Sequence, residues 1–190
     1  MYGGWRGSGS DPDLAPETGA TRELNVGWQS GHLAAWASAW DLHTRNDIVT
    51  IRGGAANLGR RESNGIDLGL RALWAEGRHE LWAYQSWIEA EQDRADHGGV
   101  VRTGPVGDTA ENKTYAGWTW RPNASWASTL RARRVSARDT VSTNPVGRVD
   151  GYATADWHLR WRFAPDDGLS LAFGVFNLTD RRYAHPGLRE

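Results

Sequence analysis

The chain has 190 residues, a formal net charge of −1 and no cysteine. Its mean hydropathy is −0.64, and no run approaches the ~18 apolar residues that a membrane-spanning helix needs. These values exclude disulfide and thiolate chemistry and a helical membrane protein, and they give no electrostatic signal for nucleic acid. A membrane barrel is still allowed, because the polar half of each barrel strand lowers the mean hydropathy.

The N-terminal residues 1–20 are rich in Gly, Ser and Pro and predict a loop. Met1 opens no signal peptide, because no basic segment leads into an apolar one. We therefore expect either a cytoplasmic protein or an internal piece of a longer exported chain. The whole chain holds 12 Trp against 3 Phe, and Trp is the residue type that anchors at membrane interfaces.

From residue 21 onward, eight segments alternate apolar and polar side chains. A period of two predicts strands with one apolar and one polar face, rather than helices. We expect strands at 21–29, 32–45, 62–74, 79–92, 112–121, 126–138, 149–163 and 168–178. The clearest is 149–163, with Ala, Leu and Trp on one face and Asp, His and Arg on the other. It far exceeds a typical soluble strand of roughly 5–6 residues.

The two faces of these strands differ in chemistry. In 62–74, Ile66 and Leu68 oppose Asp67. In 79–92 we expect Trp82, Tyr84, Ile88 and Ala90 on the apolar face, opposite Gln85, Glu89 and Glu91. The charged residues expected on the inner face are Asp67, Arg71, Glu89, Glu91, Arg131, Arg133, Asp156, His158, Arg160 and Arg162. A closed core would lose several kcal/mol for each unpaired ion, so we expect a wet lumen or a polar plug against them. Cross-strand ion pairing is their expected role, with direct ligand contact as the alternative.

The connections between strands alternate in length. Tight polar turns lie at 29–32, 75–78, 121–125 and 164–168. Long loops lie at 46–61, 93–111 and 139–148. Short turns at one end and long loops at the other are typical of an outer-membrane barrel. We predict an all-β fold, an antiparallel up-and-down meander of about eight long strands that forms a transmembrane β-barrel.

Four segments, taken in chain order, resemble TonB-dependent outer-membrane receptors. They are L-A-P-E-T at 14–18 with R-E-L-N-V-G at 22–27, S-N-G-I-D-L at 63–68, N-P-V-G-R-V-D-G-Y at 144–152 and G-V-F-N-L-T-D-R-R-Y at 174–183. The second segment has Asp67 where the family usually has Glu. The resemblance spans nearly the whole chain.

The resemblance implies that residues 1–190 are a C-terminal portion of a receptor barrel, and so a partial transmembrane β-barrel, with a loop at 1–20, strands over 21–178 and a loop at 179–190. The plug, the TonB-contacting box and the final strand would be missing. It also implies an outer membrane of a Gram-negative bacterium, lipid contact and TonB-energised uptake of a ferric siderophore or similar metal chelate. TonB would contact such a receptor only through the missing N-terminal region.

In the family, external loops and the plug apex capture the ligand. The resemblance therefore makes 46–61, 93–111, 139–148 and 179–190 the candidate ligand surface, with no individual residue assigned. No enzymatic activity and no cofactor are expected, because no G-x-S-x-G or comparable motif groups Ser, His and Asp.

Two groups of residues could in principle hold a metal ion. They are His43 with Asp41 and Asp47, and His97 with Asp93 and Asp96. Both lie at or near predicted loop ends, where solvated polar residues are the default, so no metal site is expected.

Two rival interpretations differ from the receptor fragment. A self-contained eight-stranded outer-membrane barrel would pair the strand at 21–29 with the strand at 168–178. A soluble Trp-rich ligand-binding β protein would fold without detergent. The receptor interpretation predicts that both outer strands have a free edge.

Overall fold

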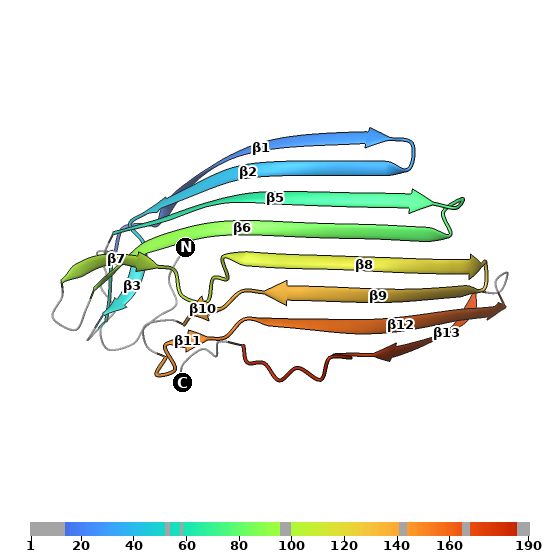
Figure 1. Ribbon diagram of the computed structural model, residues 1–190. Coiled ribbons are helices and arrows are strands. Elements are labelled where there is room, and N and C mark those ends of the chain that lie inside the picture. Colours follow the sequence, from blue (N-terminus) through green and yellow to red (C-terminus); the bar gives the residue numbers. More distant parts are fainter. Residues whose placement is uncertain are drawn as a thin grey trace.

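The structure is a computed structural model that describes residues 14–51, 54–57, 59–95, 100–140, 144–164 and 168–185. Eight long antiparallel strands form one sheet (Figure 1). They are β1 (Thr18–Ser30), β2 (Leu33–Arg45), β5 (Arg60–Trp74), β6 (His79–Ala95), β8 (Asn112–Asn123), β9 (Trp126–Val135), β12 (Tyr152–Ala164) and β13 (Leu169–Val175). Their order, β1-β2-β5-β6-β8-β9-β12-β13, confirms the predicted up-and-down meander. The described residues contain no helix, and so none long and apolar enough to cross a membrane.

Short strands occupy parts of the three long loops. They are β3 (Ile48–Ile51), β4 (Gly54–Asn57), β7 (Val101–Pro105), β10 (Arg138–Asp139) and β11 (Arg148–Val149). β3 pairs with β4, β10 pairs with β11, and β7 extends the sheet beside β6. All lie at the left-hand end of Figure 1, whereas the tight turns lie at the right-hand end. The predicted asymmetry of turns and loops is therefore present.

Two strands end earlier than the alternation predicts. The strand expected at 126–138 stops at Val135, because Arg138 and Asp139 pair with Val149 and Arg148 instead. The strand expected at 168–178 stops at Val175, and Asn177 takes a φ of 54° that interrupts extended backbone.

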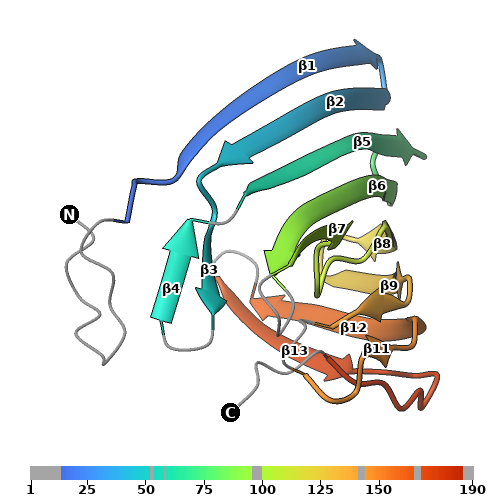
Figure 2. The ribbon, with the colours of Figure 1, turned by 90° about the vertical axis from the view of Figure 1, so that its left-hand side faces the viewer.

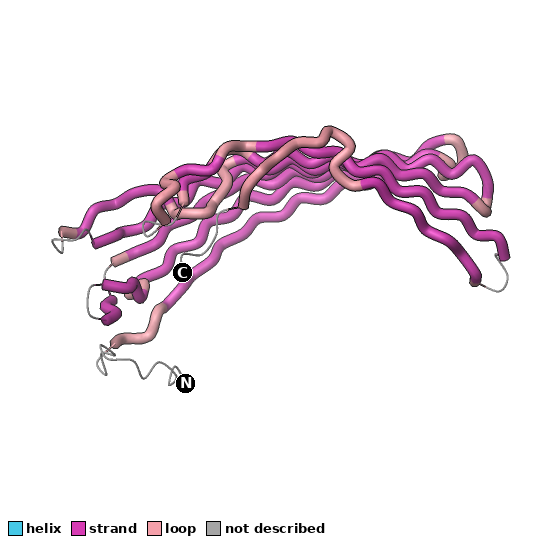
Figure 3. The backbone as a smooth tube through the Cα atoms, turned by 90° about the horizontal axis from the view of Figure 1, so that it is seen from below, coloured by secondary structure: helices cyan, strands magenta, loops and turns pink. Residues whose placement is uncertain are grey.

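The sheet is open along both outer strands. Among the described residues, β1 pairs only with β2 and β13 only with β12. Figure 3 shows the sheet as an arch, and in Figure 2 its first and last strands, β1 and β13, lie at opposite edges. The pairing that a self-contained eight-stranded barrel requires is therefore absent, and that rival is wrong for this structure.

The sheet is a single layer with almost no core. The buried hydrophobic residues among the described ones are Ala110, Val135, Val149 and Tyr152. The accessible surface is 13567 Å², whereas a folded monomer of this mass exposes about 9,000 Å². The excess reflects a sheet with no second layer packed against it.

Candidate functional surfaces

One face of the sheet is apolar and exposed. Strand register aligns Leu24 on β1 with Ala39 on β2 and Ile66 on β5, and Trp87 follows on β6. The large exposed side chains of this apolar face include Leu24, Val26, Trp28, Ile66, Leu68, Leu70, Trp74, Trp118, Trp120, Trp126, Leu130, Trp161, Phe163, Leu171 and Phe173. Soluble monomers rarely expose apolar patches of this extent, and such a patch indicates contact with a membrane or a protein.

Aromatic side chains gather on the apolar face near the tight turns. Trp126 and Trp161 stack with ring centroids 5.3 Å apart, and Trp161 lies 5.3 Å from Phe163. His79 stacks between Trp74 at 5.1 Å and Trp118 at 5.8 Å. Such a row of aromatic rings at one border of an apolar band is typical of the interface between lipid and water.

The apolar band runs obliquely across the strands. Followed from strand to strand, the register places Trp28 on β1 level with Ala155 on β12. On β12, however, the apolar band extends to Phe163, eight residues beyond Ala155. At the border nearer the loops, the band begins at Leu24 on β1 and at Val175 on β13. Val175 is level with Ser30 on β1, which lies six residues beyond Leu24. At about 3.4 Å per residue and about 4.8 Å per strand, these offsets correspond to a strand tilt of about 30–45°. Strands of membrane barrels tilt by about 35–45°.

The opposite, polar face carries the more crowded side chains. Ser38, Ser86, Thr119 and Thr154 are buried on it, although the sheet has no second layer. Crowding on this face and exposure on the other are expected if the polar face lines the inside of the arch in Figure 3. The polar face therefore corresponds to the lumen side of a larger barrel.

Three Trp side chains of the polar face lie across glycines on the neighbouring strand. A Cβ atom added to Gly69 would lie 2.0 Å from Nε1 of Trp36. Trp40 covers Gly65 in the same way, and Trp82 covers Gly117. The two residues of each pair are directly opposite in register, so the Trp ring fills the space that the glycine, which has no side chain, leaves open.

Asp67 accepts hydrogen bonds from two of the neighbouring aromatic residues on the polar face. Nε1 of Trp40 donates to Asp67 at 2.9 Å, and the hydroxyl of Tyr84 donates at 2.7 Å. These three residues come from β2, β5 and β6. The carboxylate is therefore a structural acceptor that links three strands.

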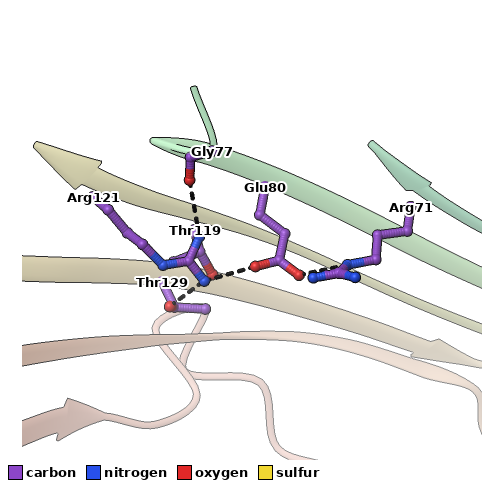
Figure 4. A network of polar contacts seen from close by, with 6 residues as sticks. All are labelled: Arg71, Gly77, Glu80, Thr119, Arg121 and Thr129. Carbon is purple, nitrogen blue, oxygen red and sulfur yellow. Dashed lines mark hydrogen bonds and ion pairs between the residues drawn. The ribbon is translucent and has the colours of Figure 1, made fainter. Parts of the chain in front are cut away.

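A second polar network lies at the turn end of the same face (Figure 4). Glu80 on β6 accepts from Nε of Arg71 at 2.8 Å and from Nη2 of Arg121 at 2.6 Å. Arg121 also donates to the carbonyl of Gly77 at 3.4 Å. Neither Glu80 nor Arg121 is among the inner charges predicted from the sequence, because the face predicted for Trp82 and Tyr84 would also place Glu80 on the apolar side. The predicted cross-strand ion pairing of inner charges is present at Arg71.

The face assignment predicted for β6 was reversed. Trp82 and Tyr84 lie on the polar face, in register with Arg71 and Gly69, whereas Gln85 shares the apolar face with Leu68. By the same register, Glu89 and Glu91 lie on the outer side, opposite Asn64 and Glu62. The error arose because aromatic rings on the polar face were taken for apolar-face residues. Ile88 and Ala90, which lie on the same side of β6 as these rings, made that assignment look consistent.

The sequence as a whole agrees with this architecture. Residues 1–178 match the family described as "TonB dependent receptor-like, beta-barrel". The chain belongs to this receptor family.

Solved receptor structures share the fold at low sequence identity. The FrpB iron transporter from Neisseria meningitidis has a TM-score of 0.76 at 17% identity, covering 95% of this chain and 29% of its own. The ferric yersiniabactin uptake receptor FyuA from Yersinia pestis has a TM-score of 0.73 at 19% identity, and the match covers 92% of this chain and 27% of FyuA. The ferric-catecholate import receptor Fiu from E. coli K12 has a TM-score of 0.71 at 18% identity, and the match covers 91% of this chain and 25% of Fiu. No curated protein sequence matches the chain. The chain thus spans about a quarter of the length of these receptors.

The receptor-like segment 174–183 forms an ordered turn beside β12. Oδ1 of Asn177 accepts from the Arg181 amide at 3.1 Å, and its Nδ2 donates to the Arg181 carbonyl at 3.1 Å. The Asn177 amide itself donates to Asp156 at 2.7 Å. At the end of the segment, Tyr183 stacks on Tyr152 with centroids 4.1 Å apart. The residues that carry the resemblance therefore hold this segment against the polar side of the barrel wall.

The described parts of the four candidate ligand loops all lie at the end opposite the tight turns (Figure 1). Their described parts include the β3–β4 hairpin, β7 and the β10–β11 pair, while 52–53, 58, 96–99, 141–143 and 186–190 lie outside the described residues. The role of these four loops as the ligand surface stays a prediction.

The two candidate metal groups differ in what the structure describes. Nε2 of His43 lies 2.9 Å from Asp41, but Asp47 is instead 3.7 Å from Nη2 of Arg61. Asp93 accepts from the hydroxyl of Thr103 at 2.8 Å, and Asp96 and His97 lie outside the described residues. Within the described ranges no group of three His, Asp or Glu side chains is arranged to hold a metal ion.

Asp47 is a buried carboxylate at the loop end. Its exposed fraction is 7%, and the adjacent Ile48 amide donates to Glu17 at 2.7 Å. Burial raises the pKa of Asp47 above its ordinary value; Arg61 opposes this shift, and Glu17 adds to it. The hydrogen bond between Ile48 and Glu17 therefore links the segment before β1 to the start of the first long loop.

Proposed function

We propose that this chain forms part of the wall of an outer-membrane receptor for TonB-energised uptake of a ferric siderophore or similar metal chelate. The observation that carries the proposal is the exposed apolar face, bordered by aromatic rings on oblique strands. In water this face would be an aggregation surface, and in a bilayer it would be the lipid contact. The outer membrane of a Gram-negative bacterium is the location that follows.

The proposed cargo is supported by the solved relatives. Their names describe a ferric-catecholate import receptor, an iron transporter and a ferric yersiniabactin uptake receptor. We assign this chain the same broad class of cargo, an iron chelate, and no enzymatic step.

Within such a receptor we assign residues 1–190 to the C-terminal part of the barrel. The order of the four receptor-like segments supports this position. The strands supply wall, and the loops 46–61, 93–111, 139–148 and 179–190 supply part of the ligand surface. We assign the contact with TonB to an N-terminal region of the receptor rather than to these strands.

The first experiment separates a membrane wall from a soluble protein. The 190-residue chain is refolded with and without detergent and compared by circular dichroism and by gel mobility before and after heating. We expect β structure and heat-modifiable mobility only with detergent. A monodisperse, folded chain in plain buffer would contradict the proposal and favour the soluble Trp-rich alternative.

The second experiment tests the cargo. The reading frame that contains this chain is deleted in its host, and growth is measured on different ferric chelates as sole iron source. We expect slower growth on at least one chelate and normal growth on a permeable iron salt. Unchanged growth on every chelate, with no other receptor compensating in the transcript profile, would overturn the assigned cargo class.

A further inference from the structure

A hollow on the polar face has no role in the wall described above. Its volume is about 500 Å³, and it is formed by β8, β9, β12, β13 and the residues just after β13. Its charged and titratable lining residues are Arg121, Arg131, His158 and Arg160, with Phe176 beside them. The hollow lies in the half of the sheet nearer the tight turns, so it is separate from the four long loops.

Small residues make room for the hollow. Arg160 is in register with Ala127 on β9 and Ala172 on β13. His158 is in register with Thr129 and Gly174 on the same two strands. Each long side chain of β12 thus has short neighbours on both sides, which leaves open space between the guanidinium groups.

The positive charge of this hollow is not neutralised within the described part of the chain. Glu80 partners Arg121, but Arg131 and Arg160 make no hydrogen bond or ion pair with a described residue. The acid directly opposite Arg131 is Asp156, which instead accepts the Asn177 amide at 2.7 Å. Two arginines therefore keep their donors available for a ligand.

The ring arrangement supports a formed site rather than loose side chains. Phe176 packs edge-on against the imidazole of His158, with centroids 5.2 Å apart. Nearby, Thr119 and Thr129 share a hydrogen bond of 2.9 Å across β8 and β9 (Figure 4). These contacts hold four lining residues, Thr119, Thr129, His158 and Phe176, in place before any ligand enters.

We propose that this hollow binds a small anion through carboxylate or phosphate oxygens, held by Arg131 and Arg160. The planar guanidinium presents paired N–H donors that match both groups, and charge-assisted bonds of this kind are the stronger ones. The site does not depend on uptake of a metal chelate, so it goes beyond the function proposed above.

The test measures binding of inorganic phosphate and of citrate to the full chain in detergent micelles, by isothermal titration calorimetry at low ionic strength. Ala127→Glu would place a carboxylate between Arg121 and Arg160, and Ala127→Gln is its uncharged control of nearly equal size. Arg160→Gln removes one donor. Arg134→Gln removes the same charge from the other face of β9.

We expect the unmodified chain to bind at least one probe, and the probe that binds identifies the preferred oxygen donor. Ala127→Glu and Arg160→Gln should weaken that binding at least tenfold, while Arg134→Gln changes it less than twofold. Ala127→Gln should retain more affinity than Ala127→Glu. Absence of binding by the unmodified chain, or an equal loss in Arg134→Gln, would overturn the site. Neither result bears on chelate uptake, which is tested by growth.

Discussion

The indole of Trp36 occupies the space that a side chain at Gly69 would need. The two residues are directly opposite on β2 and β5, and a Cβ at Gly69 would lie 2.0 Å from Nε1 of Trp36. Gly27 is opposite Trp36 on the other side, yet a Cβ there would meet nothing within 4 Å. The ring therefore leans towards β5 and leaves its β1 neighbour free.

Gly69→Ala should destabilise the folded chain, because Trp36 must leave its position over the neighbouring strand. We expect a loss of about 1–3 kcal/mol in the free energy of unfolding, as for other overpacked sites. Gly27→Ala is the matched control and should be neutral or stabilising by up to about 1 kcal/mol. Urea unfolding in detergent gives both values. Equal losses in the two variants would contradict the packing of Trp36.

Glu80 should contribute to stability through its two arginine partners. Glu80→Gln leaves Arg71 and Arg121 without their shared carboxylate. Because both guanidiniums are partly solvated, we expect a loss of roughly 1 kcal/mol at low salt and less at about 1 M salt. Glu76→Gln, in the exposed tight turn, is the control. A salt-independent loss would argue against an ionic origin.

Residues on the two faces should respond differently to an added charge. Leu68→Arg introduces a cation into the apolar face and should cost about 2–4 kcal/mol in a bilayer. Asn25→Arg puts the same charge on the polar face of β1 and should change stability by less than about 0.5 kcal/mol. Folding into lipid vesicles at increasing urea measures both. If Asn25→Arg proved the more damaging change, the two faces would have been assigned the wrong way round.

The raised pKa of Asp47 predicts a pH dependence at the loop end. Because the folded pKa lies above the ordinary value, this carboxyl adds stability in acid, in full below its unfolded pKa of about 4. That contribution is lost as pH rises through the folded pKa. Asp47→Asn should therefore stabilise this region at neutral pH and flatten its dependence between acid and neutral pH. Limited proteolysis at both pH values checks this, and an unchanged slope would refute it.

Alternation predicted the long strands because a sheet with an apolar environment on one face and a polar one on the other requires apolar and polar side chains in turn along each strand. It placed Ile66 and Asp67 on the correct faces of β5, and Trp157 and His158 on those of β12. It failed on β6, where Trp82 covers Gly117 on the polar face. An aromatic ring that fills space beside a glycine cannot be told from a lipid-facing ring by polarity alone.

The loop strands and the anion hollow could not be predicted from the sequence for a different reason. β10 and β11 have two residues each, and strands this short carry no periodic signal. The hollow depends on Ala127 and Ala172 flanking Arg160 on adjacent strands, a fact of register rather than of composition. By contrast, the motif at 174–183 marked the segment in which Asn177 forms a turn after β13.

The central claim, that the apolar face contacts lipid and the polar face does not, is tested most directly by quenching of Trp fluorescence with brominated lipids. Single-Trp variants retaining Trp118 or Trp161 on the apolar face are compared with variants retaining Trp36 or Trp82 on the polar face, after folding into vesicles. We predict strong quenching of the first pair and little of the second. Equal quenching of all four, or stronger quenching of Trp36 and Trp82, would contradict the assignment of this chain as a membrane wall.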